Sequence, residues 1–398
     1  MLSWWRFFRE NKRMMSFGFI FNFFSSFGQT FFISLFVPFW VSTYAISNAQ
    51  FGSVYAAVTV VSAFLISIVG KYIDRMPLYK YALIVYVGLL FSLLVLAKSE
   101  GVVGLFIGLF LVRWVGQGMM SHTATTGVAK FFLNNRGKAL SITSLGHASA
   151  QLILPILVVA VVGFSSWSSS LWIIGLMSLV FVLPSLQLIK LYKWPINTKT
   201  EETVVQSKSP NILRTKLFWI VSANVFIIPF LCTAVFLYQY GISQSKGWDD
   251  AWVVFSFMFY AVANFVSIVW AGDLVDRFSG KTLFPLYLIP AIIAVLLLAV
   301  FDSKFVFPLF YLLLGVSSGM GNTIKTALQA ELYGVGDLGK IRSYFSTILI
   351  LSTALGPPLF GFFIDKQYSF ATIMYFNAFV LFAIFLLSFK VWKEPSAY

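Results

Sequence analysis

The chain has 398 residues, of which 59% are hydrophobic and only 11% are charged. A soluble protein of this length carries charge on roughly a quarter of its residues, so the composition excludes a soluble globular domain and a disordered chain. The formal net charge of +14 suggests nucleic-acid binding at first, but the positions of the basic residues argue against it.

Twelve apolar stretches are long enough to cross a bilayer, which takes roughly 17–25 helical residues. Because lipid offers the backbone no hydrogen-bond partners, each stretch is predicted to be a transmembrane helix. They lie near residues 16–42, 52–69, 81–97, 103–128, 139–163, 170–189, 217–241, 251–271, 282–301, 305–330, 343–364 and 370–389. We therefore expect an all-α integral membrane protein with an N-terminal six-helix half (1–189), a polar linker (190–216) and a C-terminal six-helix half (217–398).

The basic residues predict the orientation of these helices. With the N-terminus inside, the inner segments hold 22 lysines and arginines, whereas the outer loops hold four: Lys98, Lys246, Lys304 and Lys366. Positive residues favour the cytoplasmic side, so both termini and the linker are predicted to be cytoplasmic, in an inner (plasma) membrane. The excess positive charge is then charge at the membrane surface.

A polar stretch between two apolar ones, GKYIDRMPLYK, returns later as GDLVDRFSGK. In both copies Gly, Asp and Arg keep the spacing G-x-x-x-D-R, at an offset of 202 residues: Gly70, Asp74 and Arg75, then Gly272, Asp276 and Arg277. The same offset aligns further pairs: Asn22 with Asn224, Gly137 with Gly339, Lys138 with Lys340, Ser141 with Ser343, and Pro155 with Pro357. This many matches in one register indicate a duplicated unit.

Two six-helix halves, a cytoplasmic linker and a G-x-x-x-D-R loop after the second and eighth helices resemble the major facilitator superfamily. The stretch KFFLNNRGKALSITSLGHASAQ, Lys130–Gln151, is similar to the F-F-x-x-R-R/G-x-A signature of the bacterial monocarboxylate-porter-like branch. The same branch is matched in the second half by Glu331, Gly339, Lys340, Arg342, Gly356 and Pro357. The chain departs from the branch at three places. Its first helix reads FNFFSSFGQT instead of the Asp-Gly-Gly-Trp-type opening of the branch, and its eighth helix lacks the arginine that binds substrate there. In the first G-x-x-x-D-R loop, Pro77 stands where glycine is usual.

The resemblance implies that helices 1, 4, 7 and 10 line a central cavity beside helices 2, 5, 8 and 11, and that the G-x-x-x-D-R residues control gating. Polar residues at helical spacing mark several of these helices, and polar groups in lipid must face other helices or a wet cavity. The candidate substrate-binding residues are Asn22, Ser26, Gln29, Arg113, Gln117, His147, Gln151, Tyr260, Asn264, Asn322 and Lys325. The alternative for each serine, asparagine or glutamine is a hydrogen bond between helices.

Arg113 and Lys325 are the only charged residues predicted within the spans, where no Asp or Glu accompanies them. A buried arginine stays protonated, and its fork suits two-point contact with a carboxylate. As alternatives, Arg113 belongs to an R-x-x-G-x-G stretch that resembles a fourth-helix motif for packing or coupling, and Lys325 reaches the interface. His147 is either a proton carrier or a hydrogen-bonded structural residue.

These observations predict a secondary transporter that moves a small organic anion, a carboxylate, by alternating access as a symporter or exchanger. No nucleotide-binding loop, metal-ligand cluster or nucleophile–His–Asp arrangement is evident, so we expect neither an enzyme, nor a cofactor, nor ATP or nucleic acid as partner. A coupling proton and the lipid bilayer remain expected partners. The alternatives are a proton-coupled exporter of amphipathic compounds or drugs, and a receptor or channel that does not transport.

The predicted topology can be tested with thiol reagents. Cysteines placed in the 190–216 linker should not react with an impermeant reagent in intact cells, whereas cysteines in the 242–250 loop should react. The opposite pattern would reverse the assignment of the two sides.

The first G-x-x-x-D-R loop makes a second prediction. The resemblance implies that Asp74 docks near Ser343 at the start of the eleventh helix, where a carboxylate gains roughly 0.3–2 kcal/mol from the helix dipole. Asp74→Asn should then shift the protein toward the inward-open state and slow transport, while sparing ligand binding. Spectroscopic distance measurements check this, and unchanged populations would instead favour pairing of Asp74 with Arg75 or Lys71.

Overall fold

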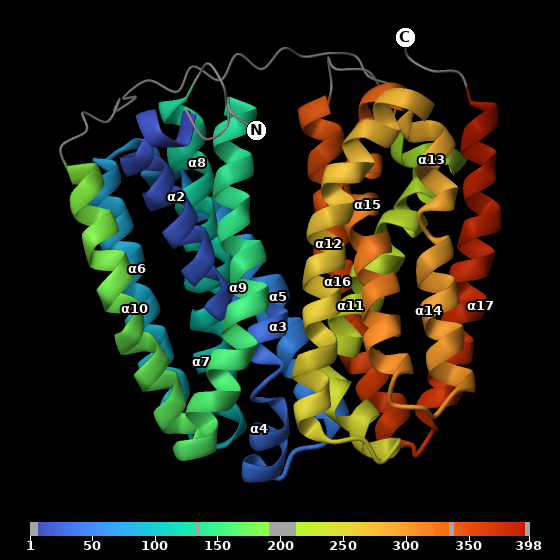
Figure 1. Cartoon of the computed structure of the whole chain (residues 1–398), viewed down its shortest axis with the longest axis horizontal. Coiled ribbons are helices and arrows are strands. Elements are labelled where there is room, and N and C mark those ends of the chain that lie inside the picture. The colour runs from blue at the N-terminus through green and yellow to red at the C-terminus, as the bar shows by residue number, and fades with distance from the viewer. Residues whose placement is uncertain (1–6, 133–135, 191–211, 334–337, 395–398) are drawn as a thin grey trace. The chain divides into compact units, whose positions relative to one another are not determined.

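The computed structural model describes residues 7–132, 136–190, 212–333 and 338–394 (Figure 1). These residues form helices joined by short turns and contain no strand, which confirms the predicted all-α class. Among them, ten helices are long and apolar enough to cross a membrane. Most of the predicted 190–216 linker lies outside the described residues, as do residues 133–135 of the Lys130–Gln151 stretch.

Contacts within the chain divide it into two compact units. The first unit comprises residues 1–46 and 57–202, and the second comprises residues 47–56 and 203–398. The start of the second predicted span thus packs with the second unit.

The described helices of the first unit begin with a broken span and continue with long helices. They are α2 (Lys12–Phe24), η1 (Ser25–Gly28), α3 (Thr30–Ile33), α4 (Val37–Tyr44), α5 (Asn48–Val69), whose start belongs to the second unit, η2 (Gly70–Asp74), α6 (Leu78–Ala97), α7 (Gly101–Val112), η3 (Arg113–Met120), α8 (Ser121–Phe131), α9 (Arg136–Phe164) and α10 (Trp167–Lys190). Here η1 and η2 are 3-10 helices and η3 is a π-helix. In this unit α6 runs beside α10, and α2 packs on α9.

The described helices of the second unit are η4 (Ile212–Arg214), α11 (Lys216–Ser245), α12 (Asp250–Phe278), α13 (Gly280–Leu286), α14 (Ile289–Val300), α15 (Val306–Tyr333), α16 (Leu338–Asp365), α17 (Phe370–Ser388) and η5 (Phe389–Lys393). The helix α11 is central, because 78% of its most apolar stretch is buried, more than in any other of the ten candidate spans. Around it α12 packs on α15 and α14 lies beside α17 (Figure 1).

Glycines set the close packing of α12 on α15. A Cβ at Gly315 would meet the carbonyl oxygen of Tyr260 at 2.5 Å, and one at Gly319 would overlap the carbonyl of Asn264. This small-xxx-small spacing is the usual way in which two membrane helices bring their backbones together. The same small and polar residues keep α15 out of the ten apolar spans, although it is helical over its predicted range.

The first predicted span is not one helix, and the prediction of a continuous helix over 16–42 is wrong. After Phe24 the chain tightens into η1, and Gln29 is extended, with φ −82° and ψ 153°. Gln29 therefore does not continue the helical face of Asn22 and Ser26. The chain resumes in α3 and α4, the latter with a proline in its first turn, where proline is tolerated because that N–H has no helical partner.

The break is matched by a distortion in the fourth span. A Cβ at Gly28 would lie 2.5 Å from the carbonyl oxygen of Val112 and would overlap the backbone nitrogen of Gln117, and a Cβ at Gly116 would lie 2.9 Å from the nitrogen of Gly28. The two backbones are in direct contact, which only glycine permits. The π-helix η3 widens the fourth span at this point of contact; such stretches are often found at functional sites.

The start of α5 is capped from another helix of the second unit. The backbone nitrogens of Asn48 and Ala49 donate to the carboxylate of Asp365 at 3.1 and 2.8 Å, and the hydroxyl of Tyr238 lies 2.8 Å from the carbonyl oxygen of Asn48. A carboxylate at a helix N-terminus satisfies orphan N–H groups and complements the dipole. The cap explains why residues 47–56 pack with the second unit.

The close approach at Gly28 can be tested by paired substitutions. Gly28→Ala should destabilise the protein by about 1–3 kcal/mol, because the methyl group must displace backbone and no side chain can give way. Gly163→Ala is the control, since no atom lies within 4 Å of a Cβ there. Thermal unfolding in detergent measures both, and equal melting temperatures would show that the contact at Gly28 is loose.

Candidate functional site

Arg113 begins η3 in the first unit and is almost completely buried, with 3% of its surface exposed. Its Nη1 donates to the carbonyl oxygen of Gly28 at 3.4 Å. The side chain thus supports the break in the first span, in line with the packing alternative for the R-x-x-G-x-G motif. Gln117 lies in the same π-helix and is half-buried, with its backbone against Gly28.

A second polar group in the first unit joins α2 and η1 to α9. Asn22 donates from Nδ2 to the carbonyl of Thr143 at 2.9 Å and accepts from Ser121 at 3.4 Å, while the hydroxyl of Ser26 lies 3.2 Å from Nδ1 of His147. These contacts bring together three of the predicted site residues, Asn22, Ser26 and His147. Thr143 completes the group through its backbone, which a pattern of side chains does not reveal.

The ring of His147 contacts two side chains of the first predicted span. Besides its hydrogen bond to Ser26, its ring contacts the ring of Phe31 edge-on, with centroids 5.8 Å apart. Gln151 lies one turn further along α9 and is buried. Gln29 is half-buried in the extended link between η1 and α3.

In the second unit Tyr260 and Asn264 lie on the face of α12 that packs against α15. The hydroxyl of Tyr260 donates to Ser318 at 3.0 Å, and the backbone at both residues contacts the glycines of α15. Their position supports a role in joining these two helices.

The remaining predicted residues, Asn322 and Lys325, line a cavity of about 340 Å³ in the second unit, which we call the Lys325 pocket. Its walls come from α11, α15 and α16: Val225, Asn322, Lys325, Thr326, Gln329, Arg342, Phe345, Ser346 and Leu349. Lys325 and Gln329 are buried, each 7% exposed, whereas Arg342 is exposed. The pocket therefore has one buried and one exposed cationic side chain, and no acidic residue is among its described lining residues.

Arg342 is not among the predicted binding residues. In the sequence it stands out only as one of the residues similar to the monocarboxylate-porter-like branch and as a basic residue near the start of the eleventh span, where basic residues are common at the cytoplasmic surface. Its distance from Lys325 along the chain, 17 residues, gives no hint that one pocket joins them.

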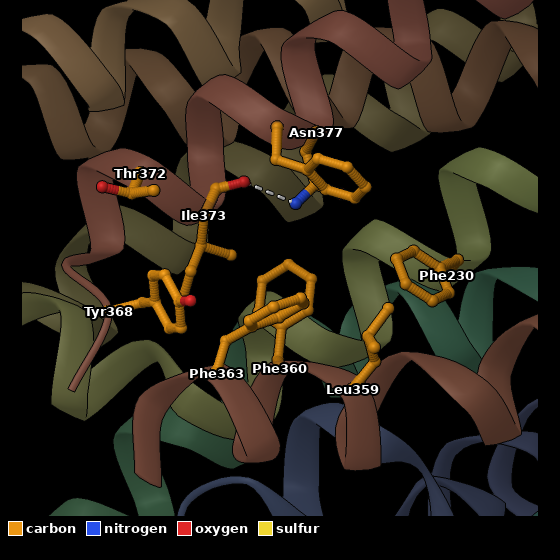
Figure 2. A pocket seen from close by; sticks show the side chains of 9 residues that line it. Phe230, Leu359, Phe360, Phe363, Tyr368, Thr372, Ile373 and Asn377 are labelled. Carbon is orange, nitrogen blue, oxygen red and sulfur yellow. Dashed lines mark hydrogen bonds between the residues drawn. The ribbon is translucent and has the colours of Figure 1, made fainter. Parts of the chain in front are cut away.

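Another cavity of the second unit differs in chemistry. It measures about 260 Å³ and is lined mostly by apolar and aromatic side chains of α11, α16, α17 and the turn between α16 and α17, with Thr372 and Asn377 as its polar members. Figure 2 shows Leu359, Phe360 and Phe363 of α16 on one side and Ile373 of α17 on the other. The amide of Asn377 donates to the carbonyl of Ile373 at 2.8 Å, within its own helix. This cavity suits hydrocarbon rather than a charged ligand.

The first G-x-x-x-D-R loop makes contacts within its own unit. The carbonyl of Gly70 lies 3.1 Å from Nε2 of His122, whose ring leaves little room for a Cβ at residue 70. Asp74 forms an ion pair with Lys130, a partner that neither the docking prediction nor its alternative names. Arg75 stacks over the ring of Tyr72, 5.2 Å from its centroid. The predicted contact of Asp74 near Ser343 would join the two units and stays a prediction.

The second copy of this loop keeps the sequence but not the contacts. Asp276 and Arg277 lie in the last turns of α12, where Arg277 is exposed, and nothing lies within 4 Å of a Cβ at Gly272. Here Glu331 takes the organising role, because its carboxylate accepts from the backbone nitrogens of Gly280 and Lys281 at 2.6 and 2.9 Å.

Comparisons with known proteins agree with this architecture. The family model of the Major Facilitator Superfamily matches residues 18–304 and 242–397. No curated protein matches the sequence. Among solved structures, a bacterial homologue of the human lysosomal transporter Spinster, inward-facing and unoccupied, is similar with a TM-score of 0.75 at 12% identity, over 96% of this chain and 97% of that one. The nucleoside transporter NupG is similar with a TM-score of 0.71 at 13% identity, over 96% of this chain and 100% of that one.

These likenesses, at 12% and 13% identity, show a shared fold over nearly the whole chain. The predicted major facilitator fold is confirmed, whereas nothing in the comparisons singles out the monocarboxylate-porter-like branch. The family model covers most of the sequence, and its members are transporters rather than enzymes. The chain is therefore a multi-pass membrane protein that belongs to the Major Facilitator Superfamily.

Proposed function

We propose that this transporter moves a small organic anion, a carboxylate, across the inner membrane by alternating access, as a symporter or exchanger. The observation that carries the proposal is the burial of two cationic side chains, Arg113 in the first unit and Lys325 in the second. Every acidic residue in the described spans lies within two turns of a helix end, and none of them forms an ion pair with Lys325. A buried cation is costly unless it is hydrated, paired or bound to an anion.

The proposed function uses the arrangement of two halves and a linker that the sequence predicts. The two halves, 1–189 and 217–398, would move against each other, with the 190–216 linker and both termini in the cytoplasm. The charge distribution in the sequence supports this orientation.

A coupling proton is compatible with His147. Its hydrogen bond to Ser26 joins α9 to the broken first span. A change in the protonation of His147 would therefore alter a hydrogen bond next to the break. His147 is thus the residue of the first unit through which we expect proton coupling, if transport is coupled to protons.

The second candidate is a proton-coupled exporter of amphipathic compounds. The aromatic cavity of Figure 2 and the phenylalanines of the first span favour it, because both offer apolar surface to a ligand. NupG is a nucleoside transporter, but at 13% identity this likeness does not indicate which substrate the present chain transports. The two candidates differ in the charge of the transported compound.

Competition and substitution test the anion hypothesis. In proteoliposomes, organic anions but not permanently cationic compounds should compete for uptake. Arg113→Gln should weaken substrate binding by roughly thirty-fold or more, about 2 kcal/mol, because the partner charge is lost. Arg113→Lys should restore part of the affinity, since it keeps the charge but loses the fork.

Lys98→Gln, at an exposed position, is the control for Arg113→Gln. The melting temperature of each variant separates a loss of binding from a loss of the contact with Gly28. Transport of a permanent cation, or normal substrate binding by a folded Arg113→Gln protein, would replace the anion hypothesis by the exporter.

A further inference from the structure

The Lys325 pocket contains a buried positive charge that forms no ion pair with the described residues and could bind a ligand. The ammonium group of Lys325 takes part in no hydrogen bond or ion pair with the described residues, although only 7% of the residue is exposed. The ring of Tyr287 lies near it, with Nζ 5.9 Å from the centroid, and the buried thiol of Cys232 is also close enough to interact with its charge. A cation–π contact of this length is weak compensation for taking an ammonium group out of water.

The surroundings of Lys325 are suited to hold an oxyanion. Gln329 is one turn further along α15 and is equally buried, so its amide can donate into the pocket. Asn322, on the other side of Lys325, and Ser346 of α16 add a second amide and a hydroxyl at the exposed part of the wall. Together with the absence of acidic side chains from the described lining, this gives donors and positive charge but no repulsion for an anion.

Arg342 stands at the exposed side of the same pocket. Its guanidinium remains hydrated there, and an exposed charge attracts an anion over a distance of about a Debye length, roughly 8 Å at physiological salt. The buried side is completed by Phe345 and Val225, which offer apolar surface to a short hydrocarbon portion. A volume of about 340 Å³ lies at the small end of ligand pockets, roughly 300–1,000 Å³.

We propose that the Lys325 pocket is an oxyanion-binding site of the second unit, in which Lys325 binds a carboxylate or phosphate group and Arg342 guides it in. The proposal rests on the proposed transport of an organic anion and adds Lys325 of the second unit to Arg113 of the first as a cation that binds an anionic group. All walls of the pocket belong to one unit, so the site does not depend on how the two units are arranged.

Binding to the purified full-length protein tests the site directly. Succinate and inorganic phosphate serve as probes, choline as the cationic control, and melting temperature in detergent as the readout. Succinate, phosphate or both should raise the melting temperature with saturation, whereas choline should not. A shift with succinate alone assigns a carboxylate, and a shift with phosphate alone assigns a phosphate group; either supports an oxyanion site.

Substitutions locate the effect. Lys325→Met should weaken anion binding at least tenfold while leaving the melting temperature without anion unchanged or higher, because it removes a buried charge and keeps most of the side-chain length. Arg342→Gln should weaken binding by about three- to tenfold, with an effect that shrinks at high salt. Lys366→Gln, at an exposed lysine just beyond the end of α16, should bind like the unmodified protein.

The outcomes separate this proposal from the proposed function. Unaltered anion binding by Lys325→Met, or a fall in its melting temperature without anion, would overturn the site and assign Lys325 a structural role. If Arg113→Gln then loses anion binding, organic-anion transport stands and the site lies in the first unit. If no anion stabilises the unmodified protein, both proposals fail together.

Discussion

Lipid supplies no hydrogen bonds, so a transmembrane helix that breaks must find partners for its freed backbone groups inside the protein. In the first unit the break at Gly28 meets this condition through the fourth span. Arg113 donates to the carbonyl of Gly28, and the backbone around Gln117 lies directly against it. This contact explains several features at once: the glycines, the widened π-helix, and a buried arginine in the middle of a span. The polar group of Asn22, Ser26 and His147 then lies just before the break, where α2 still packs on α9.

Much of the fold could be predicted from the sequence because what a membrane demands of each span is local. Each span needs its own run of apolar residues, and the lysines and arginines between them predict an orientation. Ten of the twelve predicted stretches are continuous helices in the described residues, and the stretch 282–301 is interrupted by a turn between α13 and α14. The break in the first span could not be predicted in this way. Glycine in SSFG is a poor helix former, but glycine is common inside membrane helices and does not by itself mark a break. The break depends on the backbone of the fourth span, more than 80 residues away.

The internal repeat is a good guide to architecture and a poor one to contacts. Asn22 and Asn224 are equivalent by the offset and both are buried, yet Asn22 binds the backbone of Thr143, whereas Asn224 binds the hydroxyls of Ser388 and Tyr287. Likewise Asp74 pairs with Lys130, while the second copy relies on Glu331. Duplicated sequence preserves what the helix and the membrane require of each residue. Partners across helices depend on all the neighbours, and these differ between the halves.

The two buried cations illustrate how structure refines a sequence-based site. Both stand out in the sequence for one reason, a charge in an apolar span, and nothing in that pattern distinguishes them. Their surroundings do. Arg113 lies at a backbone contact where its fork satisfies a carbonyl freed by a broken helix, a demand that the fold itself creates. Lys325 lines a cavity together with two amides, a hydroxyl and a second cation. No described contact between the helices there requires a charged side chain. Because a buried charge without a structural use costs the protein its desolvation free energy, its presence beside a cavity is best explained by a ligand.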